Sequence, residues 1–227
     1  MTDTVEVEAP EQEEPRRVFI PMPMLVFGVC LLFLAGAVGY WWAERDPSPN
    51  ATDVGFYDDM TTHHFQAIAM THRYLAHGDD PDPVMAGYAS EIDFGQSGDI
   101  RVMQDSLARW RKTGDPDVAM DWMDMPIPQF EMPGLATDAQ MDELNTASGT
   151  DLDDLFSQLM IEHHAGGVAM AEAAVEGAGL GEVKRLAENM VTVQNREIQE
   201  LNRRRVDIGL PAYEPTAGAE HEHLAEG

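Results

Sequence analysis

The chain has 227 residues and an apolar fraction of 44%, which is typical of a folded protein and not of a disordered one. Its 14 Lys and Arg stand against 41 Asp and Glu, so the net charge is -27. A chain this acidic repels phosphate backbones and has few cationic side chains with which to release counterions. The composition therefore excludes nucleic acid as a partner.

An uncharged segment near the N-terminus predicts a membrane anchor. Met24 to Trp42 carry no charge, and at ~1.5 Å per residue they can cross the ~30 Å hydrocarbon core as a helix. The segment ends on Tyr-Trp-Trp, which suits an interfacial aromatic belt, and Arg16 and Arg17 before it place the N-terminus in the cytoplasm. Cleavage of a signal peptide after the small residues Ala35 to Ala37 is the alternative.

The folded part of the chain then lies outside the cytoplasm. In chain order we expect an acidic cytoplasmic tail (1–17), a transmembrane anchor (18–43), a linker (44–52), a folded domain (53–209) and a disordered tail (210–227). Cys30, the single cysteine, falls within the anchor. A metal site in the outer domain must therefore use His, Met or carboxylate ligands.

The domain is predicted to be helical throughout. We expect helices over 53–77, 83–113, 137–147, 151–177 and 181–208, and an irregular Met- and Pro-rich segment between the second and third of them. Gly114 is placed to end the second helix, and the sequence Thr-Asp-Ala-Gln from Thr137 matches a capping box. No alternating β pattern competes with this interpretation.

The domain contains an internal repeat. The segment "MTTHHFQAIAM" (Met60 to Met70) returns as "MIEHHAGGVAM" (Met160 to Met170), with both methionines and both histidines at the same internal positions. The likeness extends to a later Gln-x-x-acid-Ile, which begins at Gln96 and again at Gln194. Repeat one covers 53–114, a Met-rich loop and short helix cover 115–149, and repeat two covers 150–209. Two duplicated helix hairpins with short turns predict an all-α, up-down four-helix bundle.

Each repeat places imidazoles and thioethers on one helix face. At about 100° per residue, the four side chains of each repeat fall within an arc of roughly 120°. The facing helices of a pseudo-twofold bundle can bring both sets together, which gives as candidate metal ligands Met60, His63, His64, Met70, Met160, His163, His164 and Met170. Thioethers favour Cu(I) and imidazole accepts copper or zinc, so this donor set without thiolate indicates copper.

The loop "MDWMDMPIPQFEM" (Met120 to Met132) adds three candidate ligands, Met120, Met123 and Met125, which are close enough in sequence to share a soft ion. The alternative for all these side chains is structural, because helical methionines often fill cores and buried histidines are often only hydrogen-bonded. Gly166 and Gly167 are unfavourable in mid-helix and indicate either close packing or room for a ligand beside the second histidine pair.

Other chemistries find little support in the sequence. A ferritin-like di-iron centre requires Glu-x-x-His motifs on two helices, and none of the expected helices carries one, so di-iron oxidase chemistry is a minor alternative. The chain also lacks G-x-S-x-G, P-loop and H-E-x-x-H motifs, which removes the usual signs of hydrolases and nucleotide enzymes. We therefore expect a binding protein and not an enzyme.

These motifs resemble the bacterial domain-of-unknown-function family three hundred and five, from about Val54 to Gly209. The strongest similarity runs from Met132 to Ala174 and includes the second His-His pair. The resemblance implies a ferritin-like helical bundle, secreted or anchored, with a copper link in some members and the same eight His and Met positions as its motif. The chain departs from the family pattern at "GQSGDI" (Gly95 to Ile100), where two glycines are expected to interrupt the second helix.

The sequence thus predicts a single-pass plasma-membrane protein whose extracytoplasmic bundle captures or buffers copper, with Cu(I) favoured, and confers tolerance to it. Its expected partners are the lipid bilayer and the metal ion, with a homo-oligomer or a metal-delivery protein left open. The alternative from another class is a structural or interaction module without metal, in which the histidines only hold the two hairpins together.

Overall fold

The computed structural model describes residues 31–36 and 48–216, which fall into two separate units divided after Asp46. Residues 31–36 are helical. Within the described ranges, no helix is both long enough and apolar enough to cross a membrane. Most of the expected anchor and the whole of the acidic tail lie outside the described residues.

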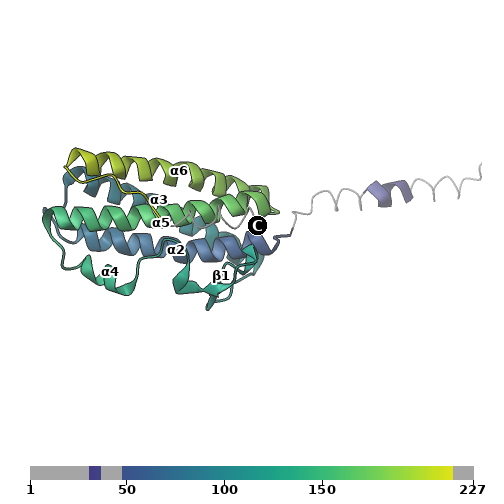
Figure 1. Ribbon diagram of the computed structural model, residues 1–227. Coiled ribbons are helices and arrows are strands. Elements are labelled where there is room, and N and C mark those ends of the chain that lie inside the picture. The colour runs from purple at the N-terminus through teal and green to yellow at the C-terminus, as the bar shows by residue number, and fades with distance from the viewer. Residues whose placement is uncertain (1–30, 37–47, 217–227) are drawn as a thin grey trace, which may run out of the picture. The chain divides into compact units, whose positions relative to one another are not determined.

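The second unit is built from helices (Figure 1). They are α2 (Ala51–Leu75), α3 (Pro83–Trp110), α4 (Asp138–Glu143), α5 (Gly149–Gly177) and α6 (Gly181–Asp207). Each lies within a few residues of an expected helix. Between α3 and α4, a segment expected to be irregular contains a small antiparallel pair, β1 (Val118–Ala119) with β2 (Ile127–Pro128), and two short 3-10 turns. The fold is all-α apart from this minimal hairpin.

The helix ends follow local capping chemistry. Asn50 and Asp53 form a capping box at the start of α2, and Thr137 and Gln140 form the expected one at the start of α4. The predicted stop at Gly114 is wrong, because α3 ends at Trp110 and its C-cap, Arg111, has a left-handed conformation with φ 56°. Gly114 instead allows close packing against α2, where a Cβ would collide with the Asp58 carboxylate.

The second helix is not interrupted by its glycines. Helix α3 runs unbroken from Pro83 to Trp110 through Gly95 and Gly98, and neither glycine has a neighbouring side chain that a Cβ would meet. Glycine costs about 1 kcal/mol relative to Ala in a helix interior, which is too little to break a helix of this length packed along one side.

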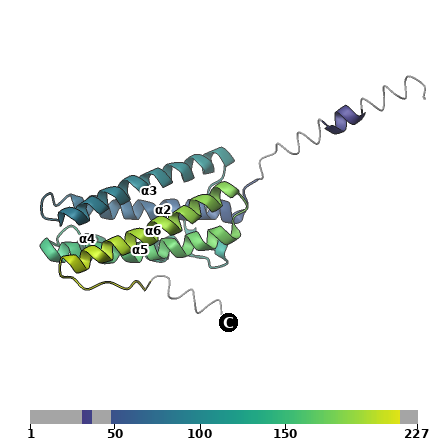
Figure 2. The same ribbon diagram turned by 90° about the horizontal axis from the view of Figure 1, so that it is seen from above.

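Each hairpin is up-down, as expected, but the four-helix order as a whole is up, down, down, up (Figures 1 and 2). The N-terminus of α2 contacts the C-terminus of α5, since the Asn50 side chain donates to the Gly177 carbonyl. At the other end Tyr74 of α2 stacks on Phe156 of α5, so these two helices are antiparallel. The expected alternating order across the hairpins is therefore wrong.

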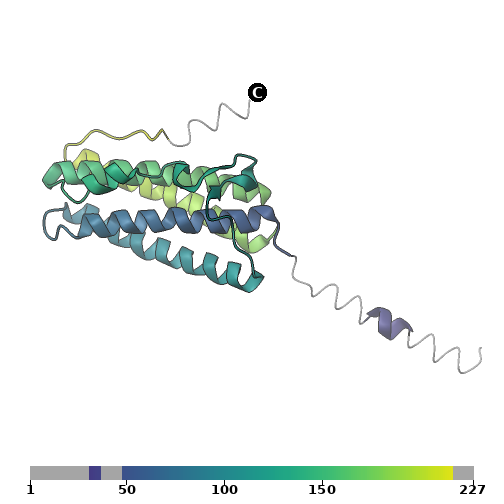
Figure 3. The ribbon, with the colours of Figure 1, turned by 90° about the horizontal axis from the view of Figure 1, so that it is seen from below.

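The reversal requires a long crossover between the hairpins. Residues 111–148 run the length of the bundle, from β1 beside the start of α2 to α4 beside its end (Figures 1 and 3). Asp59 of α2 anchors the crossover because its buried carboxylate accepts the Met120 N–H and the Trp122 Nε1–H, both at 2.8 Å. One long crossover is the connection found in ferritin-like folds.

Two equivalent aspartates tie each hairpin to the turn of the other. Asp53 on α2 accepts N–H donors from Gly179 and Leu180 in the α5–α6 turn, each at 3.0 Å. Asp153 on α5 accepts the Asp82 N–H before α3 at 2.9 Å. Both carboxylates are buried. The two repeats are thus related in the structure as well: each supplies one aspartate that accepts backbone N–H groups from the turn of the other, at opposite ends of the bundle. We call these two contacts the reciprocal caps.

The first seven residues expected to be disordered, 210–216, form an ordered strap. Tyr213 donates its hydroxyl to Glu162 Oε1 at 2.7 Å, and its N–H bonds the Asn202 side chain at 2.7 Å. Buried Arg205 donates to the Pro211 carbonyl at 3.0 Å and lies over the Tyr213 ring. Polar side chains on α5 and α6, which local sequence patterns do not reveal, hold this strap in place. Residues 217–227 lie outside the described residues.

Replacing Asp53 by Ala tests the reciprocal caps. The change leaves buried N–H groups of the α5–α6 turn without an acceptor, and we expect the free energy of unfolding to fall by about 3 kcal/mol. Urea denaturation measures the loss. Asp151→Ala, at an exposed acid in the first turn of α5, is the control and should cost less than about 1 kcal/mol. Equal losses in the two variants would contradict the capping role.

Candidate metal centre

The two His-His pairs meet in the middle of the bundle, where α2 packs against α5. All four imidazoles are fully buried. The rings of His63 and His163 lie with their centroids 3.8 Å apart at an interplanar angle of 36°, and the His163 and His164 centroids are 6.1 Å apart. The sequence prediction that the two repeats face one another across a shared interior therefore agrees with the structure.

Backbone carbonyls determine which nitrogen carries the proton in the two central rings. Nε2 of His163 lies 2.8 Å from the His63 carbonyl oxygen, and Nε2 of His63 lies 3.0 Å from the Pro133 carbonyl oxygen. A carbonyl can only accept, so both Nε2 atoms must carry hydrogen. Nδ1 of each ring is then left with an available lone pair.

Carboxylates face the two outer rings. His164 Nε2 lies 2.8 Å from Glu197 Oε2 on α6, an arrangement that also directs the lone pair to Nδ1. His64 Nε2 lies 3.6 Å from Asp99 Oδ2 on α3, which is too long for a hydrogen bond. The two halves therefore share one arrangement but differ in how tightly the carboxylate holds its imidazole.

The centre contains several buried polar atoms without hydrogen-bond partners, and most of them are acceptors. Nδ1 of all four histidines is buried without a hydrogen-bond partner, and so is Nε2 of His64. Gln96 on α3 and Gln194 on α6 are also buried, and both side-chain oxygens lack a donor. Buried polar atoms are normally paired, so these unpartnered acceptors from four helices make the histidine layer a candidate cation site.

Burial keeps three of these imidazoles, those of His63, His64 and His163, neutral. Desolvation, with a smaller contribution from the neighbouring His64, lowers the pKa of His63 to about 3. Desolvation also lowers the pKa of His163 well below its usual value, and His63 and His164 add to this effect. The pKa of His64 is lowered by burial as well, although Asp99 opposes the shift. Neutral imidazole is the form that binds metals.

The helical methionines flank the histidines in two pairs. Met60 and Met170 belong to one buried apolar cluster, and Met70 and Met160 belong to the other; none is exposed to solvent. Because α2 and α5 are antiparallel, the first methionine of each repeat lies toward the second methionine of the other. All four thioethers are interior, with one pair on each side of the histidine layer.

The loop methionines join the first of these clusters and do not form a separate surface site. Met120 is fully buried beside the Met60 cluster, and Met123 and Met125 are partly buried against it. Met120 also has a left-handed backbone with φ 61°. Burial of Asp59, whose carboxylate holds the Met120 N–H, raises the pKa of that carboxyl group.

The glycines beside the second histidine pair provide close packing, which is one of the two expected roles. A Cβ at Gly166 would collide with the Pro133 carbonyl, and one at Gly167 would collide with the Gln194 side chain. In repeat one Gln66 takes the place of Gly166, and it bonds the crossover by donating to the Ala136 carbonyl at 2.8 Å. The crossover is thus pressed against α5 at the histidine layer.

The sequence identified the imidazoles and thioethers but not the roles of the polar groups that surround them. Gln96, Gln194, Asp99 and Glu197 were recognised only as repeated letters, although their Gln-x-x-acid spacing places both side chains of a repeat on one helix face. No sequence pattern indicated the Pro133 carbonyl. Within residues 31–36 and 48–216, no set of three or more His, Cys, Asp or Glu side chains has an arrangement ready to hold a metal ion.

The family model and the solved structures that match this chain point to the same family. The model of the domain of unknown function DUF305 matches residues 53–205. A Streptomyces coelicolor DUF305 structure, of a protein predicted to be secreted, is 35% identical, with a TM-score of 0.65 over 72% of this chain and 97% of that one. A Deinococcus radiodurans DUF305 fragment is 28% identical, with a TM-score of 0.59 over 68% and 95%.

A third solved structure, of CopM in its Cu(I)-bound form, is 26% identical to this chain. Its TM-score is 0.52, and the similarity covers 70% of this chain and 99% of that one. No curated protein sequence matches at a significant level.

The neutral buried imidazoles predict an acid-sensitive fold. Because the unfolded chain takes up protons near pH 6.5 and folded His63 does so only near pH 3, the folded state binds fewer protons between these values. Stability is therefore full above pH 6.5 and falls as the pH is lowered, by up to about 1.4 kcal/mol per pH unit for each such imidazole. Urea denaturation from pH 4.5 to 7.5 with a chelator present measures this slope.

The double variant His63→Gln/His163→Gln should flatten the slope, because its amide side chains do not titrate. His72→Gln is the control, since His72 is two-thirds exposed and lies outside the site. A wild-type stability that does not change between pH 4.5 and 6.5 would contradict burial of neutral imidazoles.

Proposed function

Because this chain belongs to the DUF305 family, and because its two histidine pairs meet in one buried layer, we propose that the bundle captures copper as Cu(I). The observation that carries the proposal is the set of four buried Nδ1 atoms without partners. Three of the rings have an acceptor at Nε2, so their lone pairs remain at Nδ1 for a metal.

The donor set favours copper over harder ions. Imidazole binds copper or zinc, whereas thioethers select Cu(I), and the described interior offers no thiolate. Met60 and Met170 on one side of the histidines and Met70 and Met160 on the other supply soft donors, with Met120, Met123 and Met125 beside the first pair. The similarity to Cu(I)-bound CopM supports the same assignment.

In this proposal copper is cargo and not a catalytic group. The four histidines bind it, the thioethers favour its reduced state, and Glu197 and the backbone carbonyls orient the rings. The protein buffers or delivers the ion and catalyses no reaction. A delivery partner or a second copy of the chain then receives the metal.

The same proposal places the bundle outside the cytoplasm on a single N-terminal membrane helix. Support comes from the uncharged segment Met24 to Trp42 with its aromatic end, and from the similarity to a Streptomyces coelicolor protein predicted to be secreted. An extracytoplasmic location fits a metal-capture role.

Competition against a Cu(I) chelator tests copper capture. In His63→Gln/His163→Gln, each amide can still donate a hydrogen bond where Nε2 did, but both Nδ1 lone pairs are lost. We therefore expect the variant to fold and its Cu(I) affinity to fall at least 100-fold. His72→Ala/His77→Ala, which changes histidines outside the layer, should bind as wild type does. Unchanged affinity after replacement of all four paired histidines by Ala would refute the proposal.

Replacing Met60 and Met170 by Leu tests the preference for a soft ion. Leu nearly conserves side-chain volume, so stability should change by less than about 1.5 kcal/mol for each site. We expect Cu(I) affinity to fall about 10-fold or more while Zn(II) affinity is retained, because only the thioethers distinguish the two ions. Met85→Leu, in the other apolar cluster, is the matched control. Equal losses for both metals would remove the thioethers from the site.

A further inference from the structure

The crossover between the hairpins reaches the paired histidines at the peptide unit joining Pro133 and Gly134. This unit packs directly on α5, where a Cβ at Gly166 would collide with the Pro133 carbonyl oxygen and approach the Gly134 nitrogen. Gly134 has φ +81°, and a Cβ there would meet the Glu162 backbone oxygen. Both glycines are therefore needed for the crossover to pack this closely against α5.

The close approach serves the histidine layer. The Pro133 carbonyl oxygen lies 3.0 Å from His63 Nε2, while the His63 carbonyl oxygen lies 2.8 Å from His163 Nε2. The two central rings thus hydrogen-bond in series, with each Nε2–H donating to a backbone carbonyl. The His63 carbonyl is part of helix α2 itself, whereas the Pro133 carbonyl is in place only because the crossover packs there.

We propose that Pro133 and Gly166 are positioning residues for metal binding: Gly166 admits the Pro133 carbonyl, and that carbonyl holds the proton of His63 on Nε2 so that Nδ1 can bind the metal. The inference rests on the proposed copper function for its consequence, although the proton position itself can be measured without metal. His63 would otherwise be free to carry its proton on Nδ1, since no other acceptor is in contact with either nitrogen.

The two repeats differ at this point, which explains why the glycine occurs in only one of them. Repeat one has Gln66 at the position of Gly166, and its side chain binds Ala136 farther along the crossover, with the Ala136 N–H donating to Gln66 Oε1 at 2.7 Å. The crossover passes both helices on one side of the bundle (Figure 3). The crossover is therefore hydrogen-bonded by the Gln66 side chain on α2, whereas on α5 the absence of a side chain at Gly166 lets it pack closely.

Gly166→Ala tests the proposal in the full-length protein. The added Cβ displaces the Pro133 carbonyl without changing any metal ligand, and loss of such an orienting partner lowers metal affinity ~10- to 100-fold. Gly87→Ala is the matched control, because Gly87 also lies within a long helix and its Cβ would meet nothing. Both substitutions favour the helix to the same extent. The Cu(I) affinity of each is measured by chelator competition.

A nitrogen-15 spectrum of the imidazoles in metal-free protein provides the second measurement. Wild type and Gly87→Ala should show His63 and His163 protonated on Nε2. In Gly166→Ala we expect the His63 proton to be distributed over both nitrogens while His163, bonded to the His63 carbonyl, is unchanged. A wild-type His63 proton on Nδ1 would overturn the proposal, as would a folded Gly166→Ala with unchanged spectrum and affinity.

Gln66→Ala provides a test that introduces no collision, in case Gly166→Ala fails to fold. It removes both side-chain hydrogen bonds to Ala136 and so weakens the attachment of the crossover to α2. We expect a smaller change in the same direction in the His63 spectrum and in Cu(I) affinity; no change in either overturns the proposal. Absence of copper binding in wild type would refute the proposed function, whereas the metal-free spectrum would still decide the role of Pro133.

Discussion

The hydrogen bond from His163 Nε2 to the His63 carbonyl joins the two halves of the bundle, and the other features of the centre follow from it. It requires α2 and α5 to approach until their imidazoles lie nearly in van der Waals contact, which excludes water and leaves the rings neutral. Neutral rings whose Nε2 is engaged must present Nδ1 lone pairs. Such lone pairs are costly in an apolar interior unless a ligand takes them up.

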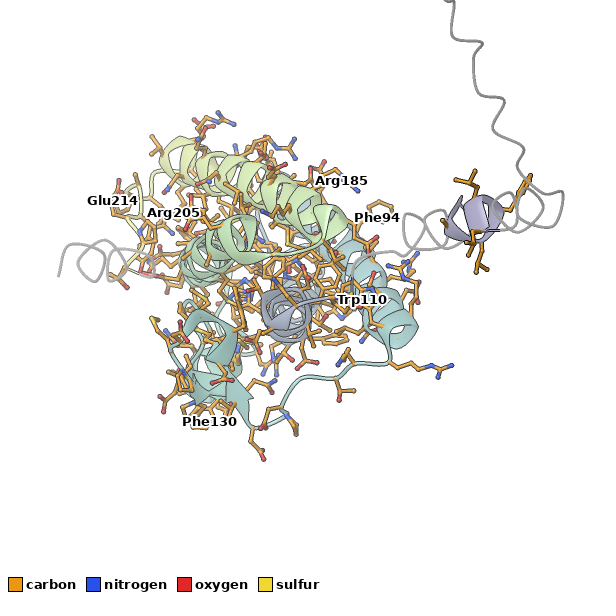
Figure 4. The ribbon with its side chains drawn as sticks, turned by 90° about the vertical axis from the view of Figure 1, so that its right-hand side faces the viewer. Phe94, Trp110, Phe130, Arg185, Arg205 and Glu214 are labelled. Atoms are coloured by element: carbon orange, nitrogen blue, oxygen red, sulfur yellow. The ribbon has the colours of Figure 1, made fainter. Side chains whose placement is uncertain are left out.

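The pseudo-twofold arrangement explains the core and also its asymmetry. Asp53 and Asp153 cap opposite hairpin turns, and the methionines of the two repeats pair across the antiparallel helices. The crossover cannot obey this symmetry because a single chain passes only one side of the bundle. Gly166 and Gln66 therefore differ. The labelled Phe94 and Phe130 point outward in Figure 4 and take no part in this interior.

Much of the fold could be predicted because helix periodicity and capping are local. The Thr137 capping box and the long helices appear close to their expected places, whereas the stop at Gly114 was wrong because the chain reaches a left-handed conformation earlier, at Arg111. The alternating order was wrong because a sequence does not reveal whether a long connection turns back or crosses the bundle. The repeat placed the carboxylates of Asp99 and Glu197 at matching positions, but their role could not be predicted because it depends on which helix faces them.

The sequence by itself determined the helices, the duplication and the paired histidines and methionines of each repeat, since spacing along a helix defines which side chains share a face. Only the tertiary structure decided that the His63 and His163 rings meet, that Glu197 holds its imidazole more closely than Asp99 does, and that Pro133 supplies an acceptor. Those contacts join residues far apart in the chain. They depend on helix direction and crossover path, which packing of the whole bundle determines and no local pattern encodes.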